Sequence, residues 1–375
     1  MFFSLALHYE ADEYQPMSQK SDFDPSGLLV KNDRYFGLPY ELEESEIVFF
    51  PVPWDVTTSY RAGTSHGPQS VLEASYQVDF FNPDVDRMWE TKMASFPFPE
   101  NWLEKNRALR KAARSYLDFL EEGGLPEEDP AQARILKQVN EGCVALHEWV
   151  TGQCRELIES GKTVILLGGD HSTSYGPIRA ISEKFSREGK TFSVLHFDAH
   201  ADLRVEYEGF VHSHASIMNH VKDFKGLHSL VQIGIRDCSP DEVATIREYE
   251  KKKSGFIHTY FDWDLKKKAY SGESWDKTCQ EISAKLGDHV YISWDIDGLD
   301  PRFCPSTGTP VPGGIELDQA FHLIRTLVSQ GKRLIGADLV EVAPPSADFD
   351  GSDWDSNVGA RVLFALATLI KKTRT

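Results

Sequence analysis

Residues 192–204 read FSVLHFDAHADLR, and this stretch decides the fold class. Its first part, FSVLHF, is a short apolar and aromatic run of the kind that forms a buried β-strand. Asp198, His200 and Asp202 follow at alternating positions, so an extended backbone would place them on one face. A buried strand that runs straight into such polar residues is typical of an α/β protein, in which ligands bind at the carboxyl ends of the strands.

The same alternation of elements continues along the chain. Short apolar runs bounded by Gly, Pro or Asp predict buried strands at 47–52, 163–167, 192–197, 230–235, 290–296 and 334–342. Helical patterns lie between them, for example at 68–80, 138–160, 240–253, 274–286, 316–330 and 357–371. The sequence therefore predicts an α/β fold with right-handed crossovers around a mostly parallel sheet.

Two regions interrupt this rhythm. Residues 1–45 are polar and irregular, which predicts a loosely attached N-terminal extension, with a lid or an arm on a neighbouring subunit as alternatives. Residues 101–133 are charged and favour helices, turn acidic at LPEEDP, and contain no strand pattern. We interpret them as a helical insertion within a single domain that spans residues 46–375.

Composition narrows the class of partner. The chain has 40 basic and 58 acidic residues, a formal charge of −18, and such a surface repels nucleic acid and anionic membranes while favouring cationic small molecules. No stretch approaches the roughly 20 apolar residues of a membrane span, and MFFSLAL lacks the basic start of a signal peptide. Five scattered cysteines indicate a reducing compartment. We expect a cytoplasmic protein without nucleic-acid or membrane partners.

Three polar motifs sit where predicted strands end: GGDHS at 168–172, DAHAD at 198–202 and DIDGLDP at 295–301. Each alone also suits a tight turn or a helix cap. Together they bring four carboxylates and two imidazoles to one crevice, namely His171, Asp198, His200, Asp202, Asp295 and Asp297.

So many neighbouring carboxylates raise one another's pKa unless cations compensate them. The set contains no thiolate, so it differs from structural zinc and suits two divalent metal ions per chain. We expect Mn²⁺ first, with Ni²⁺, Co²⁺ or Fe²⁺ after it. Asp170, Ser172 and Ser293 are adjacent candidates to support the ligands, and Trp294 should point away from them into the core.

At this point a family resemblance appears. GGDHS, LHFDAHADLR, SWDIDGLDP with STGTPVPGG, and DLVEVAPP resemble the successive signature blocks of the arginase, agmatinase and formiminoglutamase superfamily of ureohydrolases. The segment PVPWDVTTSYRAGTSHGPQSVL at 51–72 resembles its first βα unit. The resemblance runs from about residue 46 to the C-terminus, apart from 101–133. It implies a three-layer α/β/α fold and a homo-oligomer, a trimer or a hexamer.

The resemblance also implies roles for the site residues. One metal would be held by His171, Asp198, Asp202 and Asp295, and the other by His200, Asp198, Asp295 and Asp297, with Asp198 and Asp295 bridging. Metal-bound hydroxide would attack a guanidino carbon and release urea. His214 matches the histidine that protonates the leaving amine, although His212 lies nearby and the residues alone do not separate the two. Glu341 matches the carboxylate that grips the guanidinium N–H groups.

The substrate is less closely defined than the chemistry. The block DLRVEYEGFVHSHAS resembles agmatinases rather than arginases, so we expect a small cationic guanidino compound, agmatine first, with free guanidine or a guanidino acid as alternatives. Arg204 would repel an amine tail or attract a carboxylate unless Glu206 neutralises it. Two other classes are disfavoured: an inactive metal-binding homologue would have lost a ligand, and a binuclear phosphoesterase would carry different motifs.

Overall fold

One sheet of eight strands organises the computed structural model, which describes residues 23–252, 256–345 and 353–374. The strand order is β2-β1-β3-β8-β7-β4-β5-β6, and every neighbouring pair is parallel. The strands are β1 (Ile47–Val52), β2 (Met93–Ser95), β3 (Thr163–Gly168), β4 (Phe192–Phe197), β5 (Leu227–Ile235), β6 (Ile257–Phe261), β7 (His289–Asp295) and β8 (Arg333–Val340). Of the four middle strands, β3, β4 and β7 lead into the three polar motifs, and β8 leads into Glu341.

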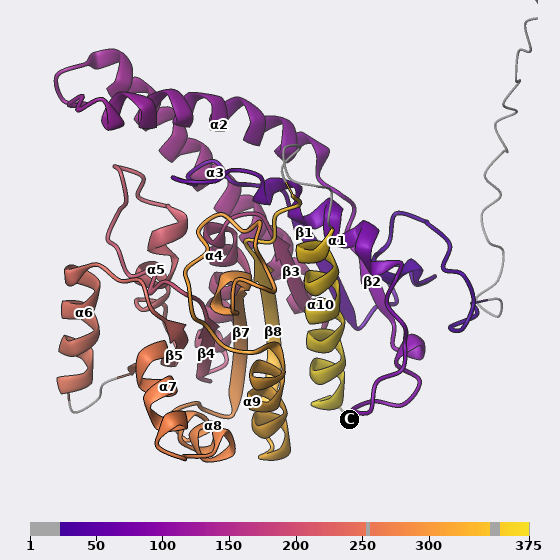
Figure 1. Ribbon diagram of the computed structural model, residues 1–375. Helices are drawn as coiled ribbons and strands as arrows, with labels where there is room; N and C mark the ends of the chain where they lie inside the picture. The colour runs from indigo at the N-terminus through magenta and orange to yellow at the C-terminus, as the bar shows by residue number, and fades with distance from the viewer. Residues whose placement is uncertain (1–22, 253–255, 346–352, 375) are drawn as a thin grey trace, which may run out of the picture.

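Helices cover both faces of this sheet (Figure 1). One face packs against α1 (Gly67–Ser75), α8 (Trp275–Ser283), α9 (Leu317–Ser329) and α10 (Trp354–Lys372). The other packs against α3 (Pro130–Glu159), α4 (Tyr175–Arg187), α5 (Ile217–Val221) and α6 (Pro240–Lys251). Strands covered on both sides must be apolar throughout, which explains their continuous hydrophobic runs. The predicted three-layer α/β/α architecture is confirmed.

The sequence did not predict the two edge strands, β2 and β6. β2 has only three residues, too few for a periodic pattern, and β6 is only partly buried beyond Ile257. Edge strands have one neighbour, so they need less continuous hydrophobicity than central strands. α7 (Asp262–Tyr270) follows β6 directly. Within the described ranges, no helix combines the length and apolar character needed to cross a membrane.

The predicted insertion is helical, but it does not stand apart from the next element. It comprises α2 (Glu100–Glu121) and the first turn of α3, which begins at Pro130 because Asp129 caps the backbone N–H groups of Ala131 and Gln132. The two long helices form a hairpin, and α2 lies across one end of the molecule (Figure 1).

Part of the predicted extension belongs to the packed body. Residues 1–22 lie outside the described residues, but Tyr35, Phe36 and Leu38 are buried. The Phe36 ring centroid lies 5.4 Å from that of Phe49 on β1 and 5.4 Å from that of Phe364 on α10. Loose attachment is therefore wrong for this part, because aromatic side chains anchor it.

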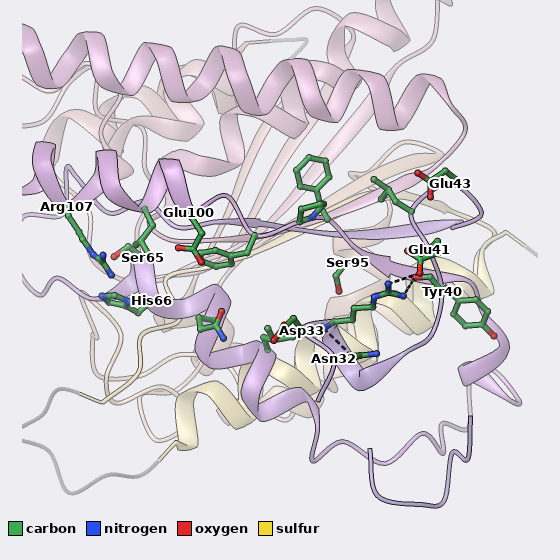
Figure 2. Close-up of a pocket in the computed structure, with 18 residues that line it drawn as sticks. Asn32, Asp33, Tyr40, Glu41, Glu43, Ser65, His66, Ser95, Glu100 and Arg107 are labelled. Atoms are coloured by element: carbon green, nitrogen blue, oxygen red, sulfur yellow. Dashed lines mark hydrogen bonds and ion pairs between the residues drawn. The ribbon is translucent and has the colours of Figure 1, made fainter. Parts of the chain in front are cut away.

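The same segment lines a polar cavity of about 850 Å³ with the start of α2 (Figure 2). Its wall includes the ion pair between Arg34 and Glu41, whose atoms lie 2.7 Å apart. None of the predicted metal ligands lines this cavity, and neither does Glu341.

Candidate active site

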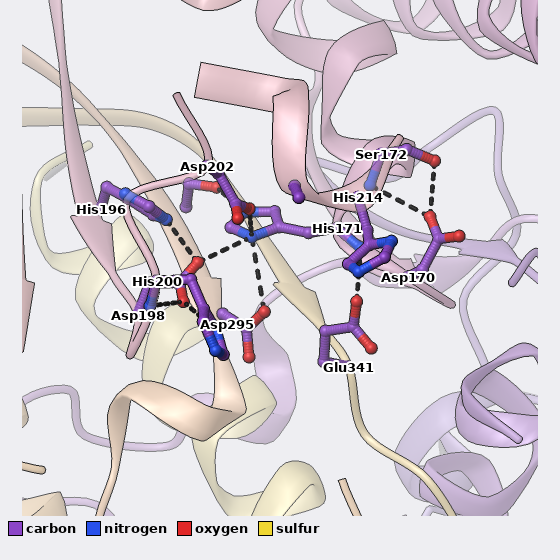
Figure 3. Close-up of polar contacts among 12 residues, drawn as sticks. Asp170, His171, Ser172, His196, Asp198, His200, Asp202, His214, Asp295 and Glu341 are labelled. Carbon is purple, nitrogen blue, oxygen red and sulfur yellow. Dashed lines mark hydrogen bonds and ion pairs between the residues drawn. The ribbon is translucent and has the colours of Figure 1, made fainter. Parts of the chain in front are cut away.

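The predicted site residues follow the carboxyl ends of four adjacent strands. His171 lies in a 3-10 turn after β3, Asp198 directly follows β4, Asp295 ends β7, and Glu341 directly follows β8. Parallel strands end at the same edge of a sheet, so residues far apart in sequence meet there. Figure 3 shows these side chains gathered around one point.

His171 is the centre of the first group of contacts. Its Nδ1 lies 3.0 Å from Asp198 Oδ2, 3.0 Å from Asp202 Oδ2 and 3.4 Å from Asp295 Oδ2. Its other ring nitrogen lies 3.0 Å from Ser293 Oγ, which donates to Asp338 Oδ1 at 3.0 Å. The ring is thus held from behind, as is usual for a metal-binding histidine. Ser293 has the supporting place that the sequence suggested.

His200 is the centre of a second group that shares Asp198 with the first. Its Nδ1 lies 3.4 Å from Asp198 Oδ1 and 3.2 Å from Asp297 Oδ2. The two oxygens of Asp198 therefore face two different histidines, which is the geometry that a bridging carboxylate requires. Asp295 contacts the His171 side, and among the described residues no ion-pair contact joins it to His200.

The spacing of these donor atoms fits bound divalent cations. Ligands about 2.1 Å from an octahedral ion lie about 3 Å from one another, close to the 3.0–3.4 Å found between the His171 ring nitrogen and the carboxylates. Two groups of candidate ligands are recognisable, and they share Asp198. The chemistry of the donors, oxygen and imidazole without thiolate, agrees with this fit.

Burial and crowding shift the protonation of the cluster. Burial raises the pKa of Asp202 to about 7, with Asp198 adding to the effect, and burial and the neighbouring Asp297 raise that of Asp295. Burial lowers the pKa of the His171 ring, but its carboxylate contacts outweigh burial and raise that pKa well above the usual value. Protons thus compensate the carboxylates in the metal-free protein, and bound metal ions would displace them.

Two site residues adopt left-handed backbone conformations. Asp202 has a φ of 53° and Glu341 a φ of 60°, values that non-glycine residues rarely adopt. The extended backbone expected through Asp202 is therefore wrong, because β4 ends at Phe197. Asp202 nevertheless reaches His171. Strain of this kind persists where the surrounding structure holds a functional side chain in place.

Glu341 presents a carboxylate with one oxygen held and one free. Its Oε1 accepts the His171 backbone N–H at 2.9 Å, while its buried Oε2 has no hydrogen-bond partner among the described residues. Burial and the nearby Asp170 raise its pKa well above the usual value. The Thr307 hydroxyl donates to its backbone carbonyl at 2.8 Å, which fixes the turn.

His214 lies on the same side of the cluster as Glu341 (Figure 3). Its backbone N–H donates to Thr57 Oγ1 at 3.2 Å, and that hydroxyl also donates to Asp170 Oδ2 at 3.3 Å. Burial lowers the pKa of the His214 ring to about 3, with His200 and Arg110 adding to the effect. The ring is therefore neutral near pH 7.

Arg110 of α2 braces the loop that carries Thr57. Its guanidinium donates to the carbonyls of Val56 at 3.1 Å and Thr58 at 2.5 Å. The insertion therefore reaches the active-site loops, whereas the described part of the extension lines the separate cavity of Figure 2. Sequence reasoning missed Arg110, because no motif surrounds it.

His212 belongs to a different neighbourhood. Its ring centroid lies 4.6 Å from that of His220 and 4.8 Å from that of His147. Burial lowers its pKa to about 4, with His220 adding to the effect. Of these two histidines, His214 is therefore the one that borders the carboxylate cluster.

His196 is a further residue that sequence reasoning missed. It lies on β4, and its Nε2 is 2.7 Å from Asp198 Oδ2. It belongs to the first group of candidate metal ligands together with His171, Asp198 and Asp202. The sequence contained a signal for this residue, because the alternation of histidine and aspartate at 198–202 begins two residues earlier, at His196 on the strand.

Two other expectations have definite outcomes. Arg204 pairs with Glu242, their Nε and Oε2 atoms lying 3.8 Å apart, and among the described residues no ion pair joins Arg204 to Glu206. The Arg204 guanidinium also lies 4.6 Å from the centre of the Tyr207 ring. Trp294 is fully buried beside Phe197, as predicted for a side chain that points away from the ligands.

A parallel α/β/α fold with this strand-end cluster has known counterparts. The family model described as "Arginase family" matches residues 45–368, so the chain belongs to the arginase family. It is 31% identical to an N(1)-aminopropylagmatine ureohydrolase of Synechocystis over 80% of this chain and 82% of that protein. It is 28% identical to the agmatinase of Bacillus subtilis over 86% of this chain and 91% of that protein.

Solved structures give the same picture. The agmatine ureohydrolase of Thermoplasma volcanium superposes with a TM-score of 0.63 and 25% identity, covering 88% of this chain and 92% of that one. The similarity extends over most of both chains. It therefore supports the family assignment and the three-layer fold together.

Proposed function

We propose that this protein is a ureohydrolase that cleaves a C–N bond of a small guanidino compound and releases urea, with agmatine as the first candidate substrate. The observation that carries the proposal is Glu341 Oε2, a buried carboxylate oxygen without a partner among the described residues, beside the cluster of candidate metal ligands. A guanidinium N–H group would satisfy this oxygen and remove the cost of its burial.

The proposed metal ligands are His171, Asp198, His200, Asp202, Asp295 and Asp297, holding two divalent ions, Mn²⁺ first and Ni²⁺ next. Bound by these residues, two such ions would supply a nucleophile by lowering the pKa of a water molecule. The negative charge of the buried carboxylates would balance the positive charge of these ions. We expect about two metal ions per chain by elemental analysis of the loaded protein, and one ion in fully active protein would contradict the proposal.

His214 is the proposed proton carrier. Its low pKa, caused first by burial, keeps the ring neutral near pH 7, so the proton that it delivers must be one that it takes from the attacking water. The leaving nitrogen receives this proton as the C–N bond breaks, giving urea and an amine. Thr57 holds the backbone of His214 in place for this transfer.

The loop between Asp202 and His214 bears on the tail of the substrate. The Tyr207 ring centroid lies 6.2 Å from that of His214, so this loop borders the site. Glu208 on the same loop has a buried Oε2 without a partner in the described part of the chain. A cationic tail that reaches this oxygen, as in agmatine, would satisfy it, although Arg110, Arg204 and Arg114 already act on the same carboxylate.

Free guanidine is the second candidate, and Arg110 favours it. The Arg110 cation lies close enough to His214 to lower the pKa of that ring, after burial and His200. A cation beside the site repels the amine of agmatine, whereas guanidine has no tail to place. The insertion would then restrict the site to the smallest guanidino compound.

A substrate panel separates these candidates. Urea release should be measured on metal-loaded protein with agmatine, free guanidine, guanidinobutyrate, guanidinopropionate and arginine. We expect agmatine or guanidine to be turned over fastest and arginine to be among the poorest. Efficient hydrolysis of arginine, or no urea from any of these compounds, would overturn the assignment. We further propose that the protein is cytoplasmic and that it forms a trimer or a hexamer. Light scattering of the metal-loaded protein gives its molar mass and so tests the oligomeric state.

A further inference from the structure

A line of polar side chains crosses three strands and ends at Asp198. His196 on β4 is in register with Gln232 on β5, and Gln232 is in register with Thr259 on β6. Side chains at paired positions point to the same face of a sheet and contact one another. His196 and Gln232 are fully buried, so their hydrogen bonds are made within the protein.

The carbonyl of Ala201 fixes the orientation of the Gln232 amide. The amide nitrogen lies 2.7 Å from Ala201 O, and a carbonyl oxygen only accepts, so this atom must be the nitrogen and not the oxygen. The amide oxygen accordingly accepts from the Thr259 hydroxyl at 2.9 Å.

This orientation fixes the proton on His196. The same Gln232 nitrogen lies 3.1 Å from His196 Nδ1, and since it donates, Nδ1 must carry a lone pair. A neutral imidazole with a bare Nδ1 carries its hydrogen on Nε2. That hydrogen points at Asp198 Oδ2, 2.7 Å away.

We propose that His196 is a positioning residue that donates a hydrogen bond to the shared carboxylate of Asp198, held in the required tautomer by Gln232 and Thr259, and is not a metal ligand. A nitrogen that carries a hydrogen has no lone pair for a metal ion. The two oxygens of Asp198 are thereby anchored separately, Oδ2 by His196 and Oδ1 by the backbone N–H of His200 at 2.6 Å. The carboxylate is oriented to bridge before metal ions arrive.

This inference rests on the proposed two-metal site, and its test measures metal binding rather than urea. The affinity of Mn²⁺ for the metal-free protein should be measured by competition with a chelator, and the stoichiometry at saturation by elemental analysis. His196→Leu should weaken Mn²⁺ binding by roughly 10–100-fold, the usual effect of losing a partner of a metal ligand, while two ions still bind at saturation. His196→Gln, whose amide can place an N–H near Asp198, should retain more affinity than the leucine variant.

Gln232→Leu gives results of opposite sign for the two roles of His196. A leucine side chain cannot donate to His196 Nδ1, so the hydrogen of the neutral ring is no longer confined to Nε2. If His196 is a donor, Mn²⁺ binding weakens, because the tautomer that donates to Asp198 is no longer held. If His196 is a ligand, Mn²⁺ binding strengthens, because a ring with a lone pair on Nε2 becomes available to the ion.

Ser229→Ala is the matched control. Ser229 and Ser193 are buried and hydrogen-bonded across the same two strands at 2.8 Å, away from the carboxylates. This variant should leave Mn²⁺ affinity unchanged, and thermal unfolding of each metal-free variant shows whether it is folded. Stronger Mn²⁺ binding by Gln232→Leu, or loss of one ion from His196→Leu, would overturn the proposal. If the wild type binds two ions but releases no urea, the proposed function fails while this inference stands.

Discussion

His212 and His214 lie two residues apart on one loop, yet their rings belong to two different groups of histidines. His214 borders the cluster in which His171 and His200 contact carboxylates. His212 stacks with His220 and contacts His147, and the His147 ring nitrogens have no partner among the described residues.

The two groups share residue type and burial but differ in their charged neighbours. Burial lowers the pKa of His171, and carboxylates reverse that effect; burial also lowers the pKa of His147, and the neighbouring histidines lower it further. Neither the identity of a histidine nor its exposure therefore indicates its role. The charged groups that face a histidine ring decide its role. Carboxylates favour the charged ring, whereas neighbouring histidines favour a neutral ring that contributes only packing.

The strongest test of this contrast is to remove one histidine from each group. His214→Ala should lower kcat for urea release by about 10²–10⁴-fold, the usual scale for a lost proton transfer, with both metal ions retained. His212→Ala is the matched control and should stay within about threefold, because its ring only packs. The reverse ranking of the two variants would show that the proton carrier is misassigned.

A second test concerns the carboxylate that lacks a partner. Glu341→Gln should lower kcat/KM by roughly 10–100-fold, because hydrogen bonds to charged groups contribute about 1.5–3 kcal/mol. Metal stoichiometry should not change, since Glu341 contacts the His171 backbone and not its ring. Steady-state kinetics with elemental analysis checks both points, and an unchanged kcat/KM would exclude contact between Glu341 and the substrate.

Acid should lower the free energy of unfolding through the group formed by His147, His212 and His220. Unfolded histidine titrates near 6.5, whereas burial, with His220 adding to it, lowers the pKa of His212 to about 4 in the fold. The unfolded chain then binds more protons below about pH 6.5, so the free energy of unfolding falls as the pH drops toward 4.

The measurement is the urea midpoint of metal-free protein as a function of pH. Changing two histidines of this group together, His147→Phe and His212→Asn, should make the fall in midpoint over this window smaller than in the wild type. Equal slopes for the two proteins would mean that other groups cause the acid sensitivity.

The smallest expected effect comes from His147→Phe alone at pH 7.5. The His147 ring stacks on Tyr175 with centroids 4.6 Å apart, and phenylalanine preserves this contact without leaving buried nitrogens unsatisfied. Changes of similar shape cost less than about 1.5 kcal/mol, so the free energy of unfolding should move by no more than that. A larger loss would reveal a hydrogen bond made by this ring.

The contrast also explains what the sequence could predict. The central strands are apolar throughout because helices cover both faces, so their pattern was readable, and the motifs at their ends converge because parallel strands share an edge. β2 and β6 lie at the edges, where that constraint is weaker. The α/β class with a mostly parallel sheet therefore followed from pattern alone, whereas the outermost strands did not, and the three layers were implied by the family resemblance.

The missed residues act through contacts that no local pattern encodes. Arg110 meets the site loop from a helix about fifty positions further along the chain, and Glu242 rather than Glu206 pairs with Arg204. His196 was visible in the alternating pattern, but its role depends on Gln232 and Thr259 on two other strands. The sequence pattern predicts which side chains lie at the carboxyl edge of the sheet. It does not predict which residues those side chains contact, because the contacts depend on the tertiary structure.

The left-handed backbones of Asp202 and Glu341 bear on how this protein responds to engineering. Glycine adopts such conformations without steric cost, and relieving strain of this kind returns of order 1 kcal/mol per position. A stabilisation campaign guided by backbone geometry alone would therefore choose glycine at Asp202, with a φ of 53°, and at Glu341, with a φ of 60°. Both choices would delete a carboxylate from the proposed site. Thermal resistance and turnover are in direct opposition at these two positions, so libraries that select for heat tolerance should hold both constant.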